Sequence, residues 1–217
     1  HRKMACGAPG ARFRVAILDP ELLSTAPHAL RFVTGIDAIA HAVESHVSTR
    51  SNPISRLFSQ QAWERLRRSF VASLEHDADL AVRGDMLLGA HLAGAAIEAS
   101  MLGAAHACAN PLTARYGMIH GLAVGLLLPH VVAFNSATVS SEYARFAAGA
   151  LDQGDDLAGM LAGLFATGGV PLRLRDHGVE FESLPALAAA AATQWTVQFN
   201  PRPLQENDLH AIYESAY

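Results

Sequence analysis

Helical signals run through almost the whole chain after Ser24, and they constrain its fold more than any other feature. Between Ile54 and Phe70 the apolar residues recur at helical spacing, which is typical of an amphipathic helix. Only residues 13–18 form a short apolar run that favours a strand, because Pro20 stops it before a helix could form. The sequence therefore predicts one all-α domain preceded by a short N-terminal strand.

The expected helices can be bounded from their caps and from the Gly- and Pro-rich connections between them. Thr34 precedes an apolar, periodic stretch and is expected to be its N-cap. Pro53 follows a Ser and an Asn and is expected in the first turn of the next helix. The predicted helices span residues 36–47, 53–70, 77–106, 141–150, 157–166, 184–192 and 206–215.

Composition and charge restrict the classes of partner. Hydrophobic residues make up 51% of the 217 residues and charged residues 17%, so much of the chain should be buried or covered. The net charge is -4 and no block of Lys or Arg occurs, which argues against a nucleic-acid partner. The densest basic cluster, Arg65, Arg67 and Arg68, is expected on a solvated helix face. The apolar run 122–128 is far shorter than the ~20 residues that span a bilayer, so no membrane partner is expected.

Cysteine usage favours a reducing, cytoplasmic location. Cys6 and Cys108 do not form a Cys-x-x-Cys pair, and nothing resembles a disulfide framework. Residues 1–6 contain no apolar stretch and do not resemble a signal peptide. Cys108 lies two residues after His106, and a buried thiol beside that residue is favoured over a role as a metal ligand.

Four potential metal ligands occur in two pairs. Asp37 and His41 are four residues apart on a predicted helix, which places a carboxylate and an imidazole on one face. Between His106 and His120 a Pro and a Gly can turn the chain, so that two helix ends face a common point. Three imidazole nitrogens and one carboxylate oxygen suit a divalent transition metal, with a position left for a substrate oxygen. This set makes an enzyme the first hypothesis.

A metal held in this way favours two kinds of chemistry. As a Lewis acid it can lower the pKa of an alcohol or polarise a carbonyl group, and hydride transfer then requires a nicotinamide cofactor. Metal-assisted hydrolysis would instead need an activated water and a general base. Glu44 follows His41 by nearly one turn, and nothing in the sequence places it at the site. The alternative for the four residues is a set of helix caps or buried polar groups without a metal.

Two segments resemble the metal motifs of the iron-containing (group III) alcohol dehydrogenases, a family of the dehydroquinate synthase-like superfamily. Residues 34–46, TGIDAIAHAVESH, are similar to the first motif. Within residues 103–135, the pattern His-x13-His-Gly followed by LLPHVVAFN is similar to the second. The segments ILDPEL at residues 17–22 and NPRPL at residues 200–204 also fit the family, so the resemblance runs from about Phe13 to the C-terminus.

The resemblance implies the fold and chemistry of the C-terminal, metal-binding half of such an enzyme. The implied metal ligands are Asp37, His41, His106 and His120. They would hold iron(II) or zinc(II), and the substrate would be a small-molecule alcohol or carbonyl compound. NAD(P) would be bound mainly by an N-terminal domain, since the chain contains no Gly-x-Gly-x-x-Gly loop. We therefore expect residues 1–23 to be the last strand and linker of that domain, and residues 24–217 to be the helical catalytic domain.

Asn110 departs from the family pattern. Many members carry a histidine four residues after the first histidine of the second motif, and here that position is Asn110. An amide can orient a substrate hydroxyl but cannot relay a proton at neutral pH. The identity of the substrate therefore stays open, and a non-catalytic metal-binding remnant and a metal-dependent hydrolase remain alternatives. Alone, the chain is expected to lack dehydrogenase activity and to associate into a homo-oligomer.

Overall fold

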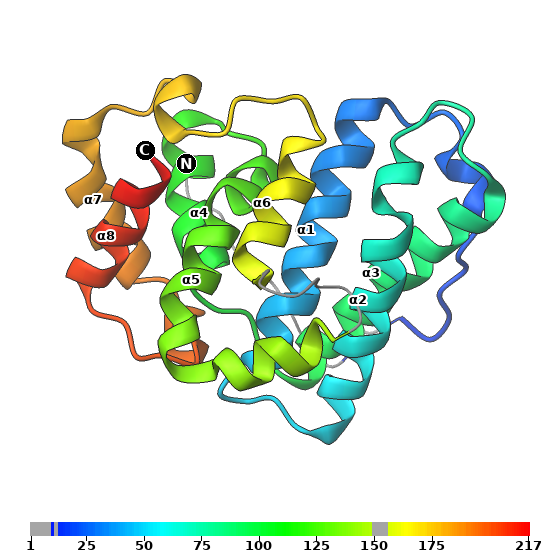
Figure 1. Cartoon of the computed structure of the whole chain (residues 1–217), viewed down its shortest axis with the longest axis horizontal. Helices are drawn as coiled ribbons and strands as arrows, with labels where there is room; N and C mark the ends of the chain where they lie inside the picture. Colours follow the sequence, from blue (N-terminus) through cyan, green and yellow to red (C-terminus); the bar gives the residue numbers. More distant parts are fainter. Residues whose placement is uncertain (1–9, 11–12, 149–155) are drawn as a thin grey trace.

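The computed structural model describes residues 10, 13–148 and 156–217, and every regular element in these residues is helical. The elements are η2 (Pro20–Leu23), α1 (His28–Val47), α2 (Pro53–Ser73), α3 (Leu80–Ala99), α4 (Ala104–Tyr116), α5 (His120–Phe146), α6 (Leu157–Ala166), η3 (Leu174–His177), η4 (Phe181–Ser183), α7 (Leu184–Ala192), η5 (Val197–Phe199) and α8 (Glu206–Ala216). Figure 1 shows α1 in the middle, with α2 and α3 on one side and α4, α5, α7 and α8 on the other. The all-α prediction is confirmed.

Residues 13–18 do not form a strand, so that prediction is wrong. The side chains of Phe13 (93%) and Ile17 (87%) are almost fully exposed. An isolated strand leaves its backbone N–H and C=O groups unpaired, and the part of the chain that the structure describes offers no neighbouring strand. The chain turns instead at Asp19, whose side chain accepts a hydrogen bond from the Glu21 N–H and caps η2.

Helix α1 begins earlier than predicted, at His28 rather than at residue 36. Pro27 precedes it in an extended conformation, and no side chain caps this end. Thr34, the predicted N-cap, lies inside the helix, where its hydroxyl donates to the Leu30 carbonyl at 2.8 Å. This bond to the preceding turn occupies the hydroxyl, so a residue with capping chemistry is tolerated in the helix interior.

The long helix predicted for residues 77–106 is two helices. α3 ends at Ala99, and Ser100 leaves the helical conformation with φ −138° and ψ −118°. α4 starts directly after Gly103, where an added Cβ would lie 3.0 Å from Asn200 Oδ1 in the C-terminal segment. The break gives α4 a new direction, so that its first turn reaches α1 (Figure 1).

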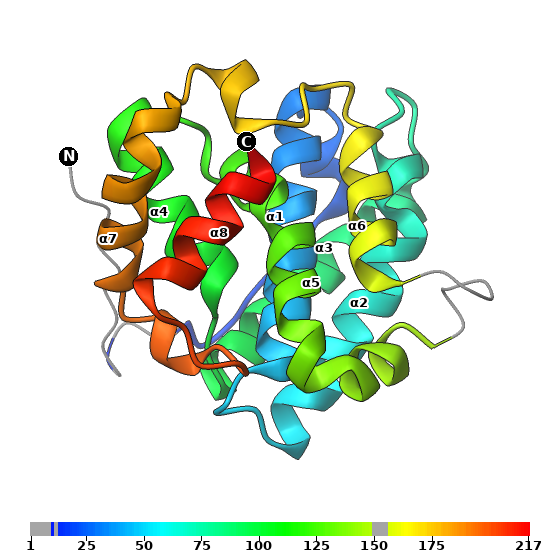
Figure 2. The same cartoon turned by 60° about the vertical axis from the view of Figure 1, so that its left-hand side comes forward.

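Helix α5 packs against α1, α4, α6 and α8 and forms the centre of one half of the molecule (Figure 2). The helix predicted for residues 141–150 is the end of α5, which kinks at Val139 and ends at Phe146; residues 149 and 150 lie outside the described part. α3 and α5 are each long and apolar enough to cross a membrane, and 50% of the α5 span is buried inside the domain. Packing against other helices accounts for the apolar composition of α5.

The boundaries of α2, α6 and α7 agree with the sequence patterns. α2 begins at Pro53, and the side chain of Asn52 closes a capping box there. The predicted basic face of α2 is more than a solvated surface, because Arg65 and Arg68 bind Asp85 of α3 at 2.8 Å and 2.6 Å. These two ion pairs join α2 to α3.

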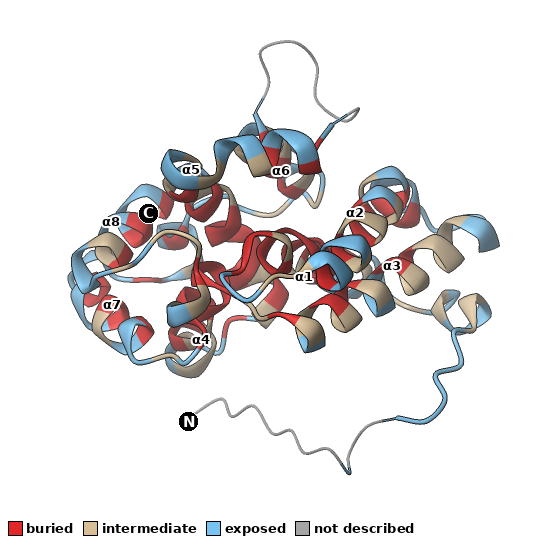
Figure 3. Ribbon diagram, turned by 90° about the horizontal axis from the view of Figure 1, so that it is seen from below, coloured by how far each residue is buried: buried red, intermediate tan, exposed pale blue. Residues whose placement is uncertain are grey.

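The inward faces of the helices carry a continuous core around α1 (Figure 3). Phe32 of α1 contacts Phe70 of α2 and Phe165 of α6, with ring centroids 6.1 Å and 5.4 Å apart. Interiors packed in this way leave side chains little room to shift. The core therefore holds α1, and the polar residues on its remaining face, in one position.

His46 lies in the contact between α1 and α2. Its Nδ1 is 2.9 Å from the Ser59 hydroxyl, and its ring centroid is 4.4 Å from that of Phe146. Burial, reinforced by the charges of Arg56 and Arg145, lowers the pKa of His46 from 6.5 to about 4. The folded chain therefore keeps this imidazole neutral at pH values where the unfolded chain protonates it.

We predict that His46 makes the fold sensitive to mild acid. Because its folded pKa is below the unfolded value, the unfolded state gains protons first, and stability is lost as pH falls from 6.5 towards 4. Between pH 7 and pH 5 this loss should be about 1 kcal/mol, allowing for partial solvent exposure. Urea unfolding of His46→Gln should show a correspondingly flatter pH dependence. An unchanged dependence would mean that His46 does not cause the acid sensitivity.

Candidate metal centre

Helix α1 supplies two of the predicted ligands. Asp37 and His41 are one turn apart, and His41 Nε2 lies 3.7 Å from Asp37 Oδ2. Both side chains are about three-quarters buried, with 24% and 25% of their surface exposed. The four-residue spacing therefore places the two groups side by side, as predicted.

Helix α4 brings the third predicted ligand. His106 is buried, and its Nε2 lies 3.4 Å from Asp37 Oδ1. Its ring stacks on that of His41, with centroids 4.8 Å apart. These three residues offer ligand atoms that all lie within 4.8 Å of one another.

Helix α5 begins at the fourth predicted ligand, His120. The next residue, Gly121, touches the backbone of α1, because a Cβ there would lie 2.0 Å from the Val33 carbonyl oxygen. This close approach sets His120 Nε2 3.9 Å from Asp37 Oδ1 and its ring 5.3 Å from that of His106. The structure thus brings all four predicted ligands together around Asp37.

The arrangement fits a divalent metal. Asp37 Oδ1 and His106 Nε2 are buried without a hydrogen-bond partner among the described residues. Leaving such an atom unpaired costs about 1–3 kcal/mol, and an ion bound between them would satisfy both. Bonds of about 2.1 Å at tetrahedral angles place ligand atoms about 3.4 Å apart. The Nε2 atoms of His41, His106 and His120 lie 3.7, 3.4 and 3.9 Å from an oxygen of the Asp37 carboxylate, which is close to that spacing.

Glu44 also belongs to the site, although the sequence alone did not predict it there. The carboxylate is 4% exposed, and its Oε2 lies 2.5 Å from His106 Nδ1. Its Oε1 accepts a hydrogen bond from the Ala105 N–H at 2.7 Å. The available signal was the seven-residue spacing from Asp37, two helical turns, which places both carboxylates on the same face of α1. Glu44 fixes the His106 ring with Nδ1–H towards the carboxylate and Nε2 towards the metal position.

The charges of the site suit metal binding. Burial raises the pKa of Asp37, but contact with His106 and the charges of the other imidazoles outweigh it and hold that pKa below its usual range. Burial and the charge of His106 lower the pKa of His41 to about 4, so this ring is neutral at pH 7. Burial also lowers the pKa of His106, but the carboxylates of Asp37 and Glu44 raise it to about 9. A metal at Nε2 would displace one proton from this ring.

Asn110 and Cys108 follow His106 on α4 by four and two residues, and neither belongs to the cluster of possible metal-binding groups among the described residues. Asn110 is one turn beyond His106, and its Nδ2 donates to Gln194 Oε1 at 3.0 Å. Cys108 is buried, its backbone carbonyl accepts a hydrogen bond from the Tyr213 hydroxyl, and burial raises the pKa of its thiol. The prediction of a buried thiol is confirmed. Gln194 was missed because no short spacing relates it to the second metal motif.

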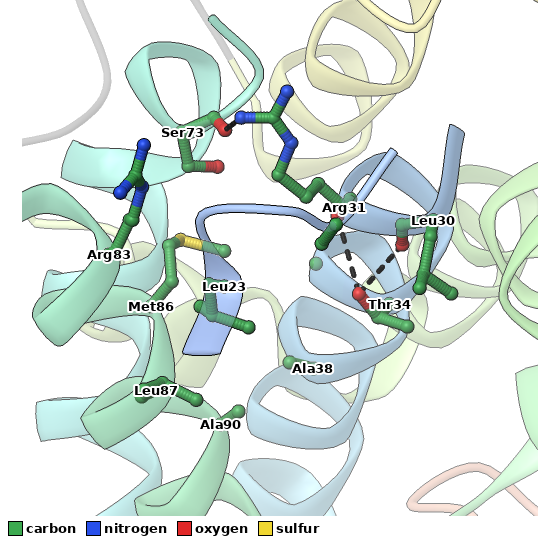
Figure 4. A pocket seen from close by; sticks show the side chains of 12 residues that line it. Leu23, Leu30, Arg31, Thr34, Ala38, Ser73, Arg83, Met86, Leu87 and Ala90 are labelled. Carbon is green, nitrogen blue, oxygen red and sulfur yellow. Dashed lines mark hydrogen bonds between the residues drawn. The ribbon is translucent and has the colours of Figure 1, made fainter. Parts of the chain in front are cut away.

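A cavity of about 280 Å³ lies away from these residues, between η2, α1 and α3 (Figure 4). Its wall is mainly apolar and includes Leu23 and Met86. The Arg31 guanidinium beside it is already bonded to the carbonyl groups of Ser73 and Glu75. None of the four ligands lines this cavity, so the chemistry of the chain is not assigned to it.

We predict that Glu44→Gln weakens metal binding about 10- to 100-fold, as loss of a carboxylate behind a metal-binding histidine does. The amide keeps the shape of the side chain but not its charge, so the His106 ring loses its strong acceptor. Calorimetric titration with zinc(II) measures the affinity. Glu98→Gln, on the exposed surface of α3, is the matched control. Equal affinities for both variants would show that Glu44 does not support the site.

Comparison with known proteins places the chain in a family. The sequence profile of the "Fe-containing alcohol dehydrogenase family, C-terminal" matches residues 31–217. The 1,3-propanediol dehydrogenase of Klebsiella pneumoniae is 32% identical over 212 residues, which are 94% of this chain and 55% of that protein. The lactaldehyde reductase of Escherichia coli K12 is 32% identical over 225 aligned positions, covering 100% of this chain and 58% of that protein.

A solved structure gives the same result. A crystal structure of 1,3-propanediol oxidoreductase superimposes with a TM-score of 0.87 at 31% identity, covering 92% of this chain and 55% of that one. The chain thus spans a little over half the length of the relatives that it matches. It belongs to the iron-containing alcohol dehydrogenase family and has the fold of that family's C-terminal helical domain.

Proposed function

We propose that this chain is the metal- and substrate-binding half of an NAD(P)-dependent alcohol dehydrogenase or carbonyl reductase. The observation that carries the proposal is that His41, His106 and His120 converge on the Asp37 carboxylate. Two of the atoms there, Asp37 Oδ1 and His106 Nε2, are buried without a hydrogen-bond partner among the described residues. Iron(II) and zinc(II) both suit three imidazoles and one carboxylate. The ligands in this proposal are Asp37, His41, His106 and His120.

The residues of the chain would divide the work as follows. When bound, the metal supplies Lewis-acid polarisation of an alcohol or carbonyl oxygen. Asp37 compensates part of the metal charge, and Glu44 holds His106 in the ligating orientation. Asn110 has a polar amide one turn from His106, in reach of a substrate beside the ligands. NAD(P)+, when bound, would supply the acceptor for the hydride of the alcohol carbon, and the hydroxyl proton would pass to water.

The nicotinamide, in this proposal, is held mainly by a second domain outside these 217 residues. The chain has no glycine-rich dinucleotide loop, and its relatives are nearly twice its length. Phe13, Val15 and Ile17 are apolar, alternate with smaller or charged residues, and are highly exposed. A second domain would cover this exposed apolar segment, which fits a division near residue 23. We further propose a cytoplasmic, homo-oligomeric enzyme, since exposed apolar surface favours association.

A metal-dependent hydrolase is less compatible with the geometry. Hydrolysis needs a carboxylate or imidazole free to take a proton from water. The carboxylate nearest to the ligands, Glu44, is 4% exposed, and both of its oxygens are engaged by His106 and the Ala105 N–H. It therefore serves the ligand rather than a water molecule.

We predict that the 217-residue chain alone binds about one divalent ion, as one ligand set implies, but shows negligible alcohol oxidation with NAD(P). Holding the nicotinamide and substrate carbons in near-attack geometry accounts for about 7–11 kcal/mol of such a barrier. Activity should appear when the nucleotide-binding half is supplied in the same polypeptide, and it should vanish with His106→Ala. The absorbance of NAD(P)H follows the reaction.

Two outcomes would contradict this account. Turnover by the 217-residue chain alone would place nicotinamide binding within it. A two-domain protein that is metal-loaded but inactive towards a broad set of alcohols and aldehydes would favour the non-catalytic remnant.

A further inference from the structure

Helix α4 begins without a side-chain cap of its own. Its N-cap residue is Gly103, which has no side chain to accept the first N–H groups of the helix. The Ala104 N–H donates instead to Asn200 Oδ1 at 3.3 Å. The Ala105 N–H donates to Glu44 Oε1 at 2.7 Å. Two side chains from distant parts of the sequence therefore cap the turn that carries a proposed metal ligand.

Glu44 needs a second fixed point to hold that ligand in place. Its other oxygen, Oε2, contacts His106 Nδ1, so both of its contacts go to neighbouring residues of α4. The carboxylate therefore directs the imidazole only while the start of α4 keeps its place against α1. Asn200 supplies the second contact to this turn.

The orientation of the Asn200 amide is fully determined. Its Nδ2 donates to Asn135 Oδ1 and to the Arg202 carbonyl, each at 2.7 Å. Its Oδ1 is thereby turned to the Ala104 N–H and to Asn135 Nδ2, which is 3.1 Å away. The amide thus uses both of its donors and both of its acceptor positions, and Asn200 is 3% exposed. Turning it over would leave donors facing donors.

The segment around Asn200 is anchored to the helices that carry the other proposed ligands. The Thr49 N–H, two residues after α1, donates to the Phe199 carbonyl at 2.9 Å. Arg202 Nη1 donates to the carbonyl of Phe134 on α5 at 2.9 Å, and its guanidinium lies 3.8 Å from the centre of that ring. Asn200 therefore ties the start of α4 to both α1 and α5.

We propose that Asn200 is a positioning residue of the metal centre. It holds the first turn of α4 so that His106 lies between Glu44 and Asp37, although it touches none of the four proposed ligands. This role rests on the proposed metal-binding function and adds a residue more than ninety positions from His106 to the machinery that sets metal affinity. Small displacements of a supporting residue are felt at a metal because ligand geometry must be held closely.

Calorimetric titration of the 217-residue chain with zinc(II) tests the proposal. Asn200→Ala removes the cap and should lower the zinc affinity about tenfold, the range of one neutral hydrogen bond. In the Glu44→Gln background, where His106 has already lost its strong acceptor, the same change should lower the affinity less than about threefold, because both residues act on one ring. An equal loss in the two backgrounds would overturn the proposal.

Two further variants separate positioning from general stability. Asp79 caps α3 by accepting from the Ala81 N–H at 2.8 Å, and α3 carries none of the proposed ligands. Asp79→Ala should therefore lower stability and leave the zinc affinity unchanged. In Gly103→Ala the new Cβ would lie 3.0 Å from Asn200 Oδ1 and 3.1 Å from Glu44 Oε1. This variant keeps every hydrogen-bonding group but pushes the two caps apart, so it should weaken zinc binding, and it decides the proposal if Asn200→Ala does not fold.

Proton NMR of the metal-free chain gives a readout that does not depend on zinc. The short, charge-assisted bond between His106 and Glu44 should give a proton signal at low field in the parent and in Asp79→Ala. The signal should be lost or shifted in Asn200→Ala. An unchanged signal together with an unchanged zinc affinity would overturn the proposal. A parent chain that binds no zinc would contradict the proposed function, and the proton signal then decides the role of Asn200 alone.

Discussion

Two carboxylates of one helix hold a buried imidazole of another, and the rest of the site depends on this contact. Asp37 and Glu44 lie on the same face of α1, and the His106 ring sits between them, with Nδ1 at Glu44 and Nε2 at Asp37. The Ala105 N–H donates to the same Glu44, so the first turn of α4 is tied to α1 through backbone as well as side chain. A buried carboxylate is stable only with partners of this quality, and these partners fix the position of α4.

The C-terminal segment supports the contact from behind. Asn200 Oδ1 accepts hydrogen bonds from the Ala104 N–H and from Asn135 Nδ2 at 3.3 Å and 3.1 Å, and Asn200 Nδ2 returns a bond to Asn135 Oδ1. Gly103 lies against both Asn200 and Glu44, where a Cβ would come within 3.1 Å of either side-chain oxygen. Residues almost a hundred positions apart thus fix the start of α4, and with it the direction of His106. The NPRPL segment, which contains none of the four proposed ligands, thus supports the site through Asn200.

The sequence predicted what depends on local spacing and missed what depends on distant contacts. Asp37 and His41 share a helix turn, so their pairing could be inferred from the chain alone. The role of Glu44 could not be inferred in this way, because a glutamate at the same spacing could equally be solvated. Only the packing of α4 against this face of α1 brings His106 to it. The prediction of a strand at residues 13–18 was wrong for a related reason. An apolar run predicts extended backbone, but a strand also requires a neighbouring strand to pair with. The contact between Asn110 and Gln194 joins segments that only the packing of α4 and α7 brings together.

X-ray absorption spectroscopy of the zinc-loaded chain tests the central claim most directly, because it reports the atoms bound to the metal. Zinc–nitrogen and zinc–oxygen bonds are about 2.0–2.2 Å long, whereas zinc–sulfur bonds are about 2.3 Å. The ligand set Asp37, His41, His106 and His120 predicts a first shell of nitrogen and oxygen only, with the outer-shell scattering of three imidazoles. Sulfur in the first shell would place Cys108 at the metal, and fewer than three imidazoles would show that the two histidine-bearing segments do not share one ion.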